Sequence, residues 1–130
     1  MLPDAGVPPG PKVGFLLQSS PQDRNGFEVF FEQCMEELGK KDSKAPWVFL
    51  RGDGVYQGLN GQRLDEPGFT VPVAGGWKAL RARGVEIYVS KRCATLRGIG
   101  TESIFVPGAR LATLERLAEL CLLSDRVVVL

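Results

Sequence analysis

The chain has 130 residues, of which 44% are hydrophobic and 24% are charged, and its formal net charge is +1. These values are typical of one globular domain, and the nearly neutral charge gives no sign of a nucleic-acid or anionic-membrane partner. The sequence contains no histidine, which excludes Ser-His-Asp and Cys-His catalysis and most zinc sites.

The first eleven residues contain four prolines and two glycines, and no basic end is followed by an apolar block. We therefore expect a flexible tail over residues 1–11 rather than a signal peptide. No apolar run reaches the roughly 18 residues of a membrane span. The three cysteines have no CxxC spacing, which argues against a disulfide framework and favours a reducing cytoplasm. We expect a cytoplasmic protein with a single domain over residues 12–130.

A strand and an amphipathic helix are predicted for the first third of the chain. Val13–Leu17 is a short apolar run typical of a buried strand. After the loop 18–26, apolar side chains recur at helical spacing as far as Gly39, which ends the helix. These apolar positions are Phe27, Phe30, Phe31, Cys34, Met35 and Leu38. The pattern places Cys34 and the phenylalanines in the core.

The middle of the chain predicts a second strand, a long irregular segment and the end of a helix. Trp47–Leu50 is again a buried apolar run, and a glycine-rich turn follows at 52–54. Residues 56–76 are rich in glycine and irregular; a segment this long inside a compact domain is usually functional or lies at a subunit contact. Residues 77–84 are typical of a helix end with a glycine stop.

The last third predicts three strands and one helix. A buried strand over 85–89 leads into the segment that contains Cys93, and residues 103–106 are expected to form a short fourth strand. Residues 126–130 close the chain as a fifth strand. An apolar stripe before them predicts a second helix and places Cys121 in its buried face. The stripe consists of Leu111, Leu114, Leu117, Ala118, Cys121 and Leu122.

Nearly continuous apolar strands that alternate with helices are typical of a parallel sheet covered on both faces. We therefore predict an α/β fold, a flavodoxin-like three-layer sandwich with a five-stranded parallel sheet in the order 2-1-3-4-5. In that order the first and third strands are neighbours where the chain reverses direction, and ligands bind there, outside the carboxyl ends of the strands. The loops at this point would be 18–26 and 90–98.

Cys93 is the strongest candidate for chemistry. It lies just past a predicted strand, at the expected start of a short helical turn. The basic residues Lys91 and Arg92 before it, Arg97 after it, and the free N–H groups of a helix start would all favour the nucleophilic thiolate. The structural alternative is a cysteine that fills a small gap at a strand end while Arg97 is solvated.

The spacing between Cys93 and Arg97 narrows the choice of chemistry. Phosphatase and rhodanese loops place about five residues between the cysteine and the arginine, so that backbone N–H groups wrap an oxyanion. Three residues separate them here, which excludes a standard loop of either kind.

A second and weaker candidate is the loop after the first strand. Ser19, Ser20 and Asn25 would hold a phosphate at the start of a helix, which is the basis for a nucleotide-binding or flavin-binding alternative. The sequence has no GxGxxG or Walker pattern in support. A plain helix cap made by Asn25 or Asp23 explains the same residues.

Arg51-Gly52-Asp53 spells an adhesion tripeptide after the second strand. In a cytoplasmic protein we interpret this match as coincidence. Asp53 forms a turn with the next glycine or lines the site.

Over residues 12–130 the sequence resembles the DsrE/DsrF-like family, which includes the TusD-like and YchN-like sulfur-relay proteins. The matching features are the first strand with its loop, Asp53-Gly54-Val55, Arg83-Gly84-Val85, Cys93-x-x-x-Arg97-Gly98-Ile99 and the ending Ser124-Asp125-Arg126. The resemblance implies a flavodoxin-like fold, assembly into trimers or hexamers, and a persulfide carried on a cysteine in the strand-end loop. TusD-like members carry that cysteine seven residues before the arginine of the Arg-Gly pair, where this chain has Ser90. Other members carry it four residues before, where this chain has Cys93.

We hypothesise that the protein is a sulfur carrier or sulfurtransferase-like protein. The Cys93 thiolate would attack a persulfide on a donor protein, hold the sulfane sulfur and pass it to the thiol of an acceptor protein. The residues expected around the substrate are Arg97, Gly98, Ser19, Ser20, Asn25, Arg92 and Asp53. No metal or organic cofactor is expected, and the protein is expected to be a homo-oligomer. The alternative is a non-catalytic module of the same fold that binds a nucleotide or another anion, or serves as an oligomeric scaffold.

Overall fold

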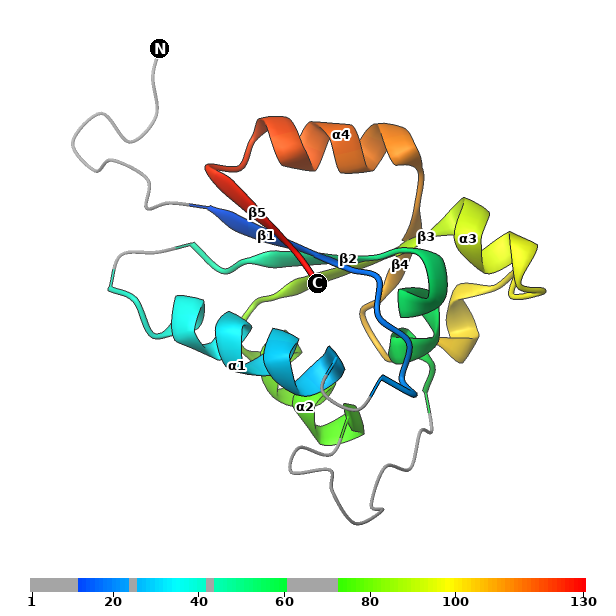
Figure 1. Ribbon diagram of the computed structural model, residues 1–130, viewed down its shortest axis with the longest axis horizontal. Helices are drawn as coiled ribbons and strands as arrows, with labels where there is room; N and C mark the ends of the chain where they lie inside the picture. Colours follow the sequence, from blue (N-terminus) through cyan, green and yellow to red (C-terminus); the bar gives the residue numbers. More distant parts are fainter. Residues whose placement is uncertain (1–11, 24–25, 42–43, 61–72) are drawn as a thin grey trace.

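The computed structural model describes residues 12–23, 26–41, 44–60 and 73–130. They form a three-layer α/β sandwich around one parallel sheet (Figure 1). The predicted tail over residues 1–11 lies outside these ranges, as do residues 61–72 of the irregular segment.

Five short strands form the sheet, and each runs parallel to its neighbours. They are β1 (Val13–Leu17), β2 (Trp47–Leu50), β3 (Glu86–Ser90), β4 (Arg110–Ala112) and β5 (Arg126–Val129). The strands β1, β2 and β3 are buried along almost their whole length. Their continuous apolar sequences follow from this burial, because a parallel sheet is covered on both faces.

The helices form the two outer layers (Figure 1). Helices α1 (Gly26–Leu38) and α2 (Val73–Ala82) cover one face, and α4 (Leu114–Leu122) covers the other. The shorter elements are α3 (Lys91–Leu96) and the 3₁₀ helices η1 (Gly52–Gly58) and η2 (Glu102–Ile104). The predicted sandwich with a five-stranded parallel sheet is thereby confirmed. Within the described ranges, each helix is too short or too polar to span a bilayer.

The larger core lies between the sheet and the helices α1 and α2. The ring of Phe30 is centred 5.4 Å from the rings of both Phe15 and Trp77, and Cys34 is fully buried in the same layer, as predicted. The indole Nε1 of Trp77 donates a 2.7 Å hydrogen bond to the carbonyl oxygen of Gln57. This bond connects the core directly to η1, which begins just after β2.

The smaller core, under α4, is organised by Trp47. Its indole is fully buried and lies so close to Gly14 that a Cβ there would be 2.0 Å from the ring. The indole Nε1 donates to the hydroxyl of Ser124 at 2.7 Å, and that hydroxyl donates to the carbonyl oxygen of Leu120 at 2.6 Å. One hydroxyl therefore joins β2 to the end of α4.

The residues just after α4 fasten β5 to the rest of the molecule. Asp125 accepts a hydrogen bond from the amide of Lys12 and donates its own amide to the Lys12 carbonyl, both at 2.9 Å. Arg126 donates at 2.5 Å to the carboxylate of Glu37, which is 6% exposed. These contacts lie at the amino ends of parallel strands, whereas Cys93 follows a carboxyl end. The Ser-Asp-Arg ending therefore stabilises the fold and lies at the other end of the sheet from Cys93.

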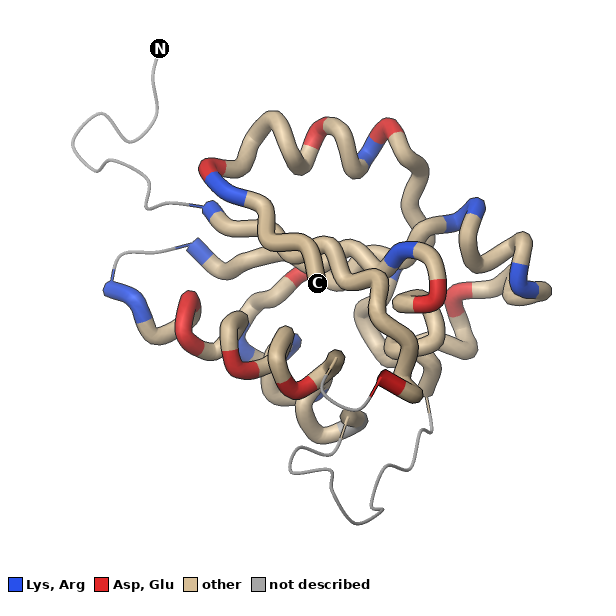
Figure 2. Tube along the Cα trace, in the orientation of Figure 1, with Lys and Arg blue, Asp and Glu red and all other residues tan. Residues whose placement is uncertain are grey.

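Charged residues are distributed unevenly over the molecule (Figure 2). Acidic residues recur along α1, at Glu28, Glu32 and Glu36. Basic residues lie at both ends of the sheet, and at the carboxyl end Arg51 precedes η1 and Lys91 and Arg92 begin α3. This end of the sheet is the one that carries Cys93.

The predicted strand order, 2-1-3-4-5, is wrong: the order is β4-β3-β2-β1-β5. Each step from β1 to β4 moves in the same direction, so right-handed crossovers place α1 and α2 on one face. The direction reverses once, when α4 crosses the other face to bring β5 beside β1. The connection after β3 packs into the same core as α1 and α2, whereas the connection after β4 crosses the other face. The two connections therefore diverge at the carboxyl ends of β3 and β4, which makes this the reversal point of the sheet, and the loop 18–26 is not part of it.

The predicted fourth strand over 103–106 is also wrong. The hydroxyl of Thr101 accepts a hydrogen bond from the amide of Ser103, and this cap begins the helical turn η2. Phe105 then forms a single antiparallel bridge with Leu59. The actual fourth strand is β4, and it contains Leu111, which the apolar pattern places in the helix stripe.

Cys121 is exposed, although the apolar pattern predicted a core position. The sheet-facing positions of α4 are Leu117 and Leu120. The apolar residues Leu114 and Leu122 are 69% and 86% exposed. Helix α4 carries more apolar positions than one face can hold, so periodicity alone could not separate its buried stripe from its exposed one.

Candidate functional site

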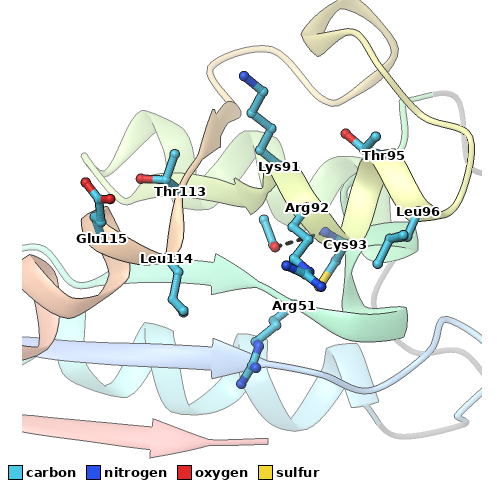
Figure 3. A pocket seen from close by; sticks show the side chains of 10 residues that line it. Arg51, Lys91, Arg92, Cys93, Thr95, Leu96, Thr113, Leu114 and Glu115 are labelled. Atoms are coloured by element: carbon cyan, nitrogen blue, oxygen red, sulfur yellow. Dashed lines mark hydrogen bonds between the residues drawn. The ribbon is translucent and has the colours of Figure 1, made fainter.

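A cavity of about 620 Å³ opens at the carboxyl ends of β2, β3 and β4 (Figure 3). It lies at the reversal point of the sheet, where α/β proteins of this kind bind ligands. Its lining includes Arg51, Ser90, Arg92, Cys93, Leu96 and Leu114. Of the residues predicted around the substrate, Arg92 thus lines the same cavity as Cys93.

Cys93 lies in the first turn of α3, which starts immediately after β3. The last residue of β3, Ser90, caps this helix, and its hydroxyl oxygen accepts a 3.2 Å hydrogen bond from the Cys93 amide. Serine is a favoured cap because its oxygen pairs with an N–H that the helix leaves free. Ser90, where the resemblance would place the cysteine of TusD-like members, thus fixes the half-buried Cys93 at the cavity.

The surroundings of Cys93 lower the pKa of its thiol below the ordinary value of a cysteine. Partial burial acts in the opposite direction, because it disfavours the charged thiolate. Hydrogen bonds from the Ser90 hydroxyl and the Gly52 backbone N–H, together with the positive charges of Arg97 and Arg51, outweigh this burial. Since the thiolate is the nucleophile, the site increases the reactive fraction of Cys93 at a given pH.

Arg97 fastens α3 to η1. Its Nε and Nη2 atoms donate to one carboxylate oxygen of Asp53 at 3.2 and 2.9 Å, and its Nη1 donates to the Cys93 carbonyl oxygen at 3.1 Å. The guanidinium also lies 6.0 Å from the centre of the Tyr56 ring. The sequence nominated Arg97 to hold an anion and Asp53 to line the site. The structure brings the two together as an ion pair that positions the Cys93 loop.

Gly98 ends α3 in a left-handed conformation. Its φ is +77°, which favours glycine, and its amide donates to the carbonyl oxygen of Thr95 at 3.0 Å. The next amide, of Ile99, returns to the carbonyl of Ala94 at 2.9 Å, and the Ile99 side chain is buried. In the Arg-Gly-Ile segment, Arg97 joins α3 to η1, Gly98 ends α3 and Ile99 packs into the core.

Arg51 and Gly52 contribute to the surroundings of Cys93, so the tripeptide interpreted above as a coincidental match lies at the site. Arg51 directly follows β2, and its amide donates to the Leu17 carbonyl oxygen at 3.0 Å. Gly52 has a φ of +57°, and its N–H reaches the Cys93 thiol. The sequence signal that could have identified Arg51 and Gly52 as site residues was their place at the carboxyl end of a buried strand. The predicted strand order hid it, because that order separated β2 from β3.

Gly54 seats η1 on the end of β1. A Cβ at this position would lie 2.0 Å from the carbonyl oxygen of Leu17. The amide of Gly54 donates to the carbonyl oxygen of Arg51 at 2.9 Å, which closes the turn. In the Asp53-Gly54 pair, the aspartate holds Arg97 and the glycine permits the close approach to β1.

The loop after β1, predicted as the opposite wall of the site, faces a different hollow. Ser20 lines a hollow of about 340 Å³ together with Asp53. The backbone carbonyl of Ser19 accepts a 3.1 Å hydrogen bond from the side-chain amide of Gln57. Asn25 lies outside the described residues. The structure therefore leaves Ser19 and Ser20 outside the lining of the Cys93 cavity.

The three cysteines have different environments. Cys34 is fully buried, and its burial, with the nearby charge of Glu37, raises its pKa to about 12. Cys93 is half-buried and has a lowered pKa, and Cys121 is exposed on α4. A thiol reagent can therefore modify two cysteines of the folded protein: Cys93 in the cavity and Cys121 on α4.

We expect the alkylation rate of Cys93 to reach half its maximum at a lower pH in the folded protein than in the unfolded chain. The reason is that the folded state lowers the thiol pKa, so more thiolate is present at every pH below the ordinary value. Peptide mass spectrometry after iodoacetamide treatment of a Cys121→Ser protein, over a pH series with and without urea, measures this shift. Cys34 should react only in urea. A midpoint that does not move, or moves upward on folding, would contradict the electrostatics described above.

The fold and the site together define a class of protein: a parallel α/β sandwich with a half-buried cysteine of lowered pKa in the short helix that follows β3. The model of the DsrE/DsrF-like family matches residues 12–130, so the chain belongs to this family of sulfur-relay proteins, as the sequence motifs predicted. The structure is similar to the crystal structure of the YchN protein from E. coli, with a TM-score of 0.73 and 24% sequence identity. The likeness covers 92% of this chain and 99% of that one. A comparison with curated proteins found no match.

Proposed function

We propose that the protein carries sulfane sulfur as a persulfide on Cys93 and passes it to an acceptor thiol. The observation that carries this proposal is the environment of the thiol. Cys93 lines a cavity at the reversal point of the sheet, and donors from two neighbouring strand ends lower its pKa. Membership of a sulfur-relay family supports the same chemistry. The donor and acceptor proteins and the homo-oligomer expected from the resemblance stay predictions.

Loading the carrier is a thiol exchange without net oxidation. The Cys93 thiolate attacks the outer sulfur of a donor R–S–SH. A bond forms between Sγ and that sulfur, the donor S–S bond breaks, and R–S⁻ leaves and takes up a proton from water. In the second step an acceptor thiolate attacks the outer sulfur of the Cys93 persulfide, and the Cys93 thiolate leaves. A lowered pKa helps this second step, because a thiol of lower pKa is a better leaving group.

The surrounding groups have separate tasks in this cycle. The Gly52 amide and the Ser90 hydroxyl donate hydrogen bonds to the sulfur, and the charges of Arg97 and Arg51 stabilise its anionic forms. Arg97 also acts through position, since its ion pair with Asp53 holds α3 against η1. Both steps are thiol exchanges, so neither needs an oxidant or a reductant.

We expect the protein to gain one sulfur atom, about 32 Da, after incubation with a persulfide donor, and to lose it on reduction. Intact-protein mass spectrometry measures this mass. The parent protein should carry Cys121→Ser, because the exposed Cys121 would otherwise add a second site of modification. Cys34, with a pKa of about 12, serves as an internal thiol that stays unmodified in the folded state.

Adding Cys93→Ser to this parent should abolish the adduct. Circular dichroism of both proteins checks that the fold is kept. If the Cys93→Ser protein gains the same adduct, or if the parent gains none from several donors, the carrier proposal is wrong. The non-catalytic, anion-binding alternative would then be favoured.

A further inference from the structure

We infer that the cavity beside Cys93 binds the persulfide of a small acidic thiol, which delivers its outer sulfur to Cys93 and leaves as the thiol, and that Arg51 and Arg92 hold the carboxylates of this compound. The inference rests on the proposed function, because it names the substrate class of the same cysteine. The sulfur donor in this inference is a low-molecular-weight compound rather than a second protein. Three features support it: the size of the cavity, the unpaired positive charges in its lining, and its apolar rim.

The cavity has the size of a small-molecule site. Its volume of about 620 Å³ lies within the range of roughly 300–1,000 Å³ that is usual for such sites. The leucines Leu96 and Leu114 stand at its rim on two different helices and are 72% and 69% exposed. The carbon skeleton of a bound compound would cover these apolar side chains while its sulfur reaches Cys93.

The charges in the lining favour an anion. Three cations line the cavity: Arg51 after β2, and Lys91 and Arg92 in α3. Among the described residues, none of the three takes part in a salt bridge or a side-chain hydrogen bond. By contrast, the three arginines Arg97, Arg116 and Arg126 each pair with a carboxylate of this chain.

The arrangement of charges also indicates which anion fits. The guanidinium group is planar and pairs well with carboxylates through two parallel hydrogen bonds, and Arg51 and Arg92 come from two different elements around Cys93 (Figure 3). Glu115 adds one negative charge on the α4 side of the cavity. A compound with carboxylates, an ammonium group and a central thiol matches this pattern, and a short acidic thiol peptide has all three.

The first test is binding without reaction. S-methyl glutathione has two carboxylates and one ammonium group but no free thiol, so it cannot transfer sulfur. Calorimetric titration should show that it binds the Cys121→Ser protein, and that its dimethyl ester binds more weakly. Arg51→Gln and Arg92→Gln should each weaken binding by about three- to tenfold, as expected for an exposed, charge-assisted contact. Arg110→Gln is the matched control, since Arg110 is exposed on β4 and does not line this cavity.

The second test is the preference between donors. The rate of Cys93 persulfidation by glutathione persulfide is compared with the rate by the cationic cysteamine persulfide. We expect the acidic donor to be faster, and the ratio of the two rates to fall about three- to tenfold in Arg51→Gln and Arg92→Gln but not in Arg110→Gln. The ratio is used because Arg51 also lowers the Cys93 pKa, so its loss slows both donors together.

The outcomes separate this inference from the proposed function. If both donors load Cys93 at equal rates in all variants and S-methyl glutathione does not bind, the acidic-thiol site is overturned while the carrier function stands. Loading by a protein persulfide alone would overturn the site in the same way. If S-methyl glutathione binds through Arg51 and Arg92 but no donor loads Cys93, the binding site is supported and the carrier function is wrong.

Discussion

Replacing Gly54 with alanine is expected to lower the free energy of unfolding by about 3 kcal/mol and to slow alkylation of Cys93 at neutral pH. The new Cβ would lie 2.0 Å from the carbonyl oxygen of Leu17. That oxygen belongs to the backbone of a buried strand, so it cannot rotate away as a side chain would. Helix η1 must move instead, and it carries the Gly52 N–H away from the Cys93 thiol. The pKa of Cys93 should then rise toward its ordinary value.

Urea unfolding and the pH series of Cys93 alkylation measure the two effects in one protein. Gly100→Ala is the matched control, because Gly100 is exposed and its Cβ would meet no atom within 4 Å. We expect this control to stay within about 0.5 kcal/mol of the parent, as most surface substitutions do. A Gly54→Ala protein with the stability and alkylation profile of the parent would show that η1 does not depend on this contact.

Gly14→Ala should destabilise the protein by a similar amount, about 3 kcal/mol, because it disrupts the packing of the smaller core under α4. A Cβ at Gly14 would lie 2.0 Å from the indole of Trp47. The indole has no free direction in which to move, because it is fully buried and its Nε1 is bound to Ser124. The clash falls at the amino-terminal half of β1, away from η1. The pKa of Cys93 in the folded protein should therefore stay as low as in the parent.

A double-variant cycle tests whether the indole is the cause. In a Trp47→Phe background the smaller ring leaves room for the new methyl group, so Gly14→Ala should cost less than it does beside tryptophan. Equal costs in the two backgrounds, measured by urea unfolding, would place the clash elsewhere. The two glycine variants together would also separate loss of stability from loss of thiol activation.

The strands with continuous apolar sequences could be predicted, and the shortest one could not. β1, β2, β3 and β5 lie within one residue of their predicted bounds, because an unbroken apolar run is what a strand covered on both faces requires. β4 has only three residues, Arg110–Ala112, and one of them is an exposed arginine. Its membership of the sheet depends on pairing with β3, which no local pattern reports.

The order of the strands could not be predicted from the sequence pattern, for the same reason. Right-handed crossovers are compatible with both the predicted and the observed order, so the choice depends on which strand edges meet. The error had a consequence for the site. Cys93 was found from its own loop, but Arg51 and Gly52 were missed because β2 was not expected beside β3.

The sequence indicated which residues belong to the site more readily than it indicated what each of them does there. Arg97 and Asp53 were both nominated, yet they lie 44 positions apart in the chain, and nothing local indicated that they form a pair. Cys121 was assigned to the core because α4 has apolar residues around more than half of its circumference. Which of these residues face the sheet is decided by the position of the whole helix.

The donor from Gly52 has a consequence for how this protein would appear in a mutational scan. The group that contacts the thiol is a backbone N–H, which no ordinary substitution removes except proline. A substitution at Gly52 itself acts through strain, because its φ of +57° disfavours other residues. Side-chain scanning would thus assign the activation of Cys93 mainly to Ser90 and the arginines. The contribution of the peptide backbone would be invisible in such data, and it would emerge only from variants that move the backbone as a whole.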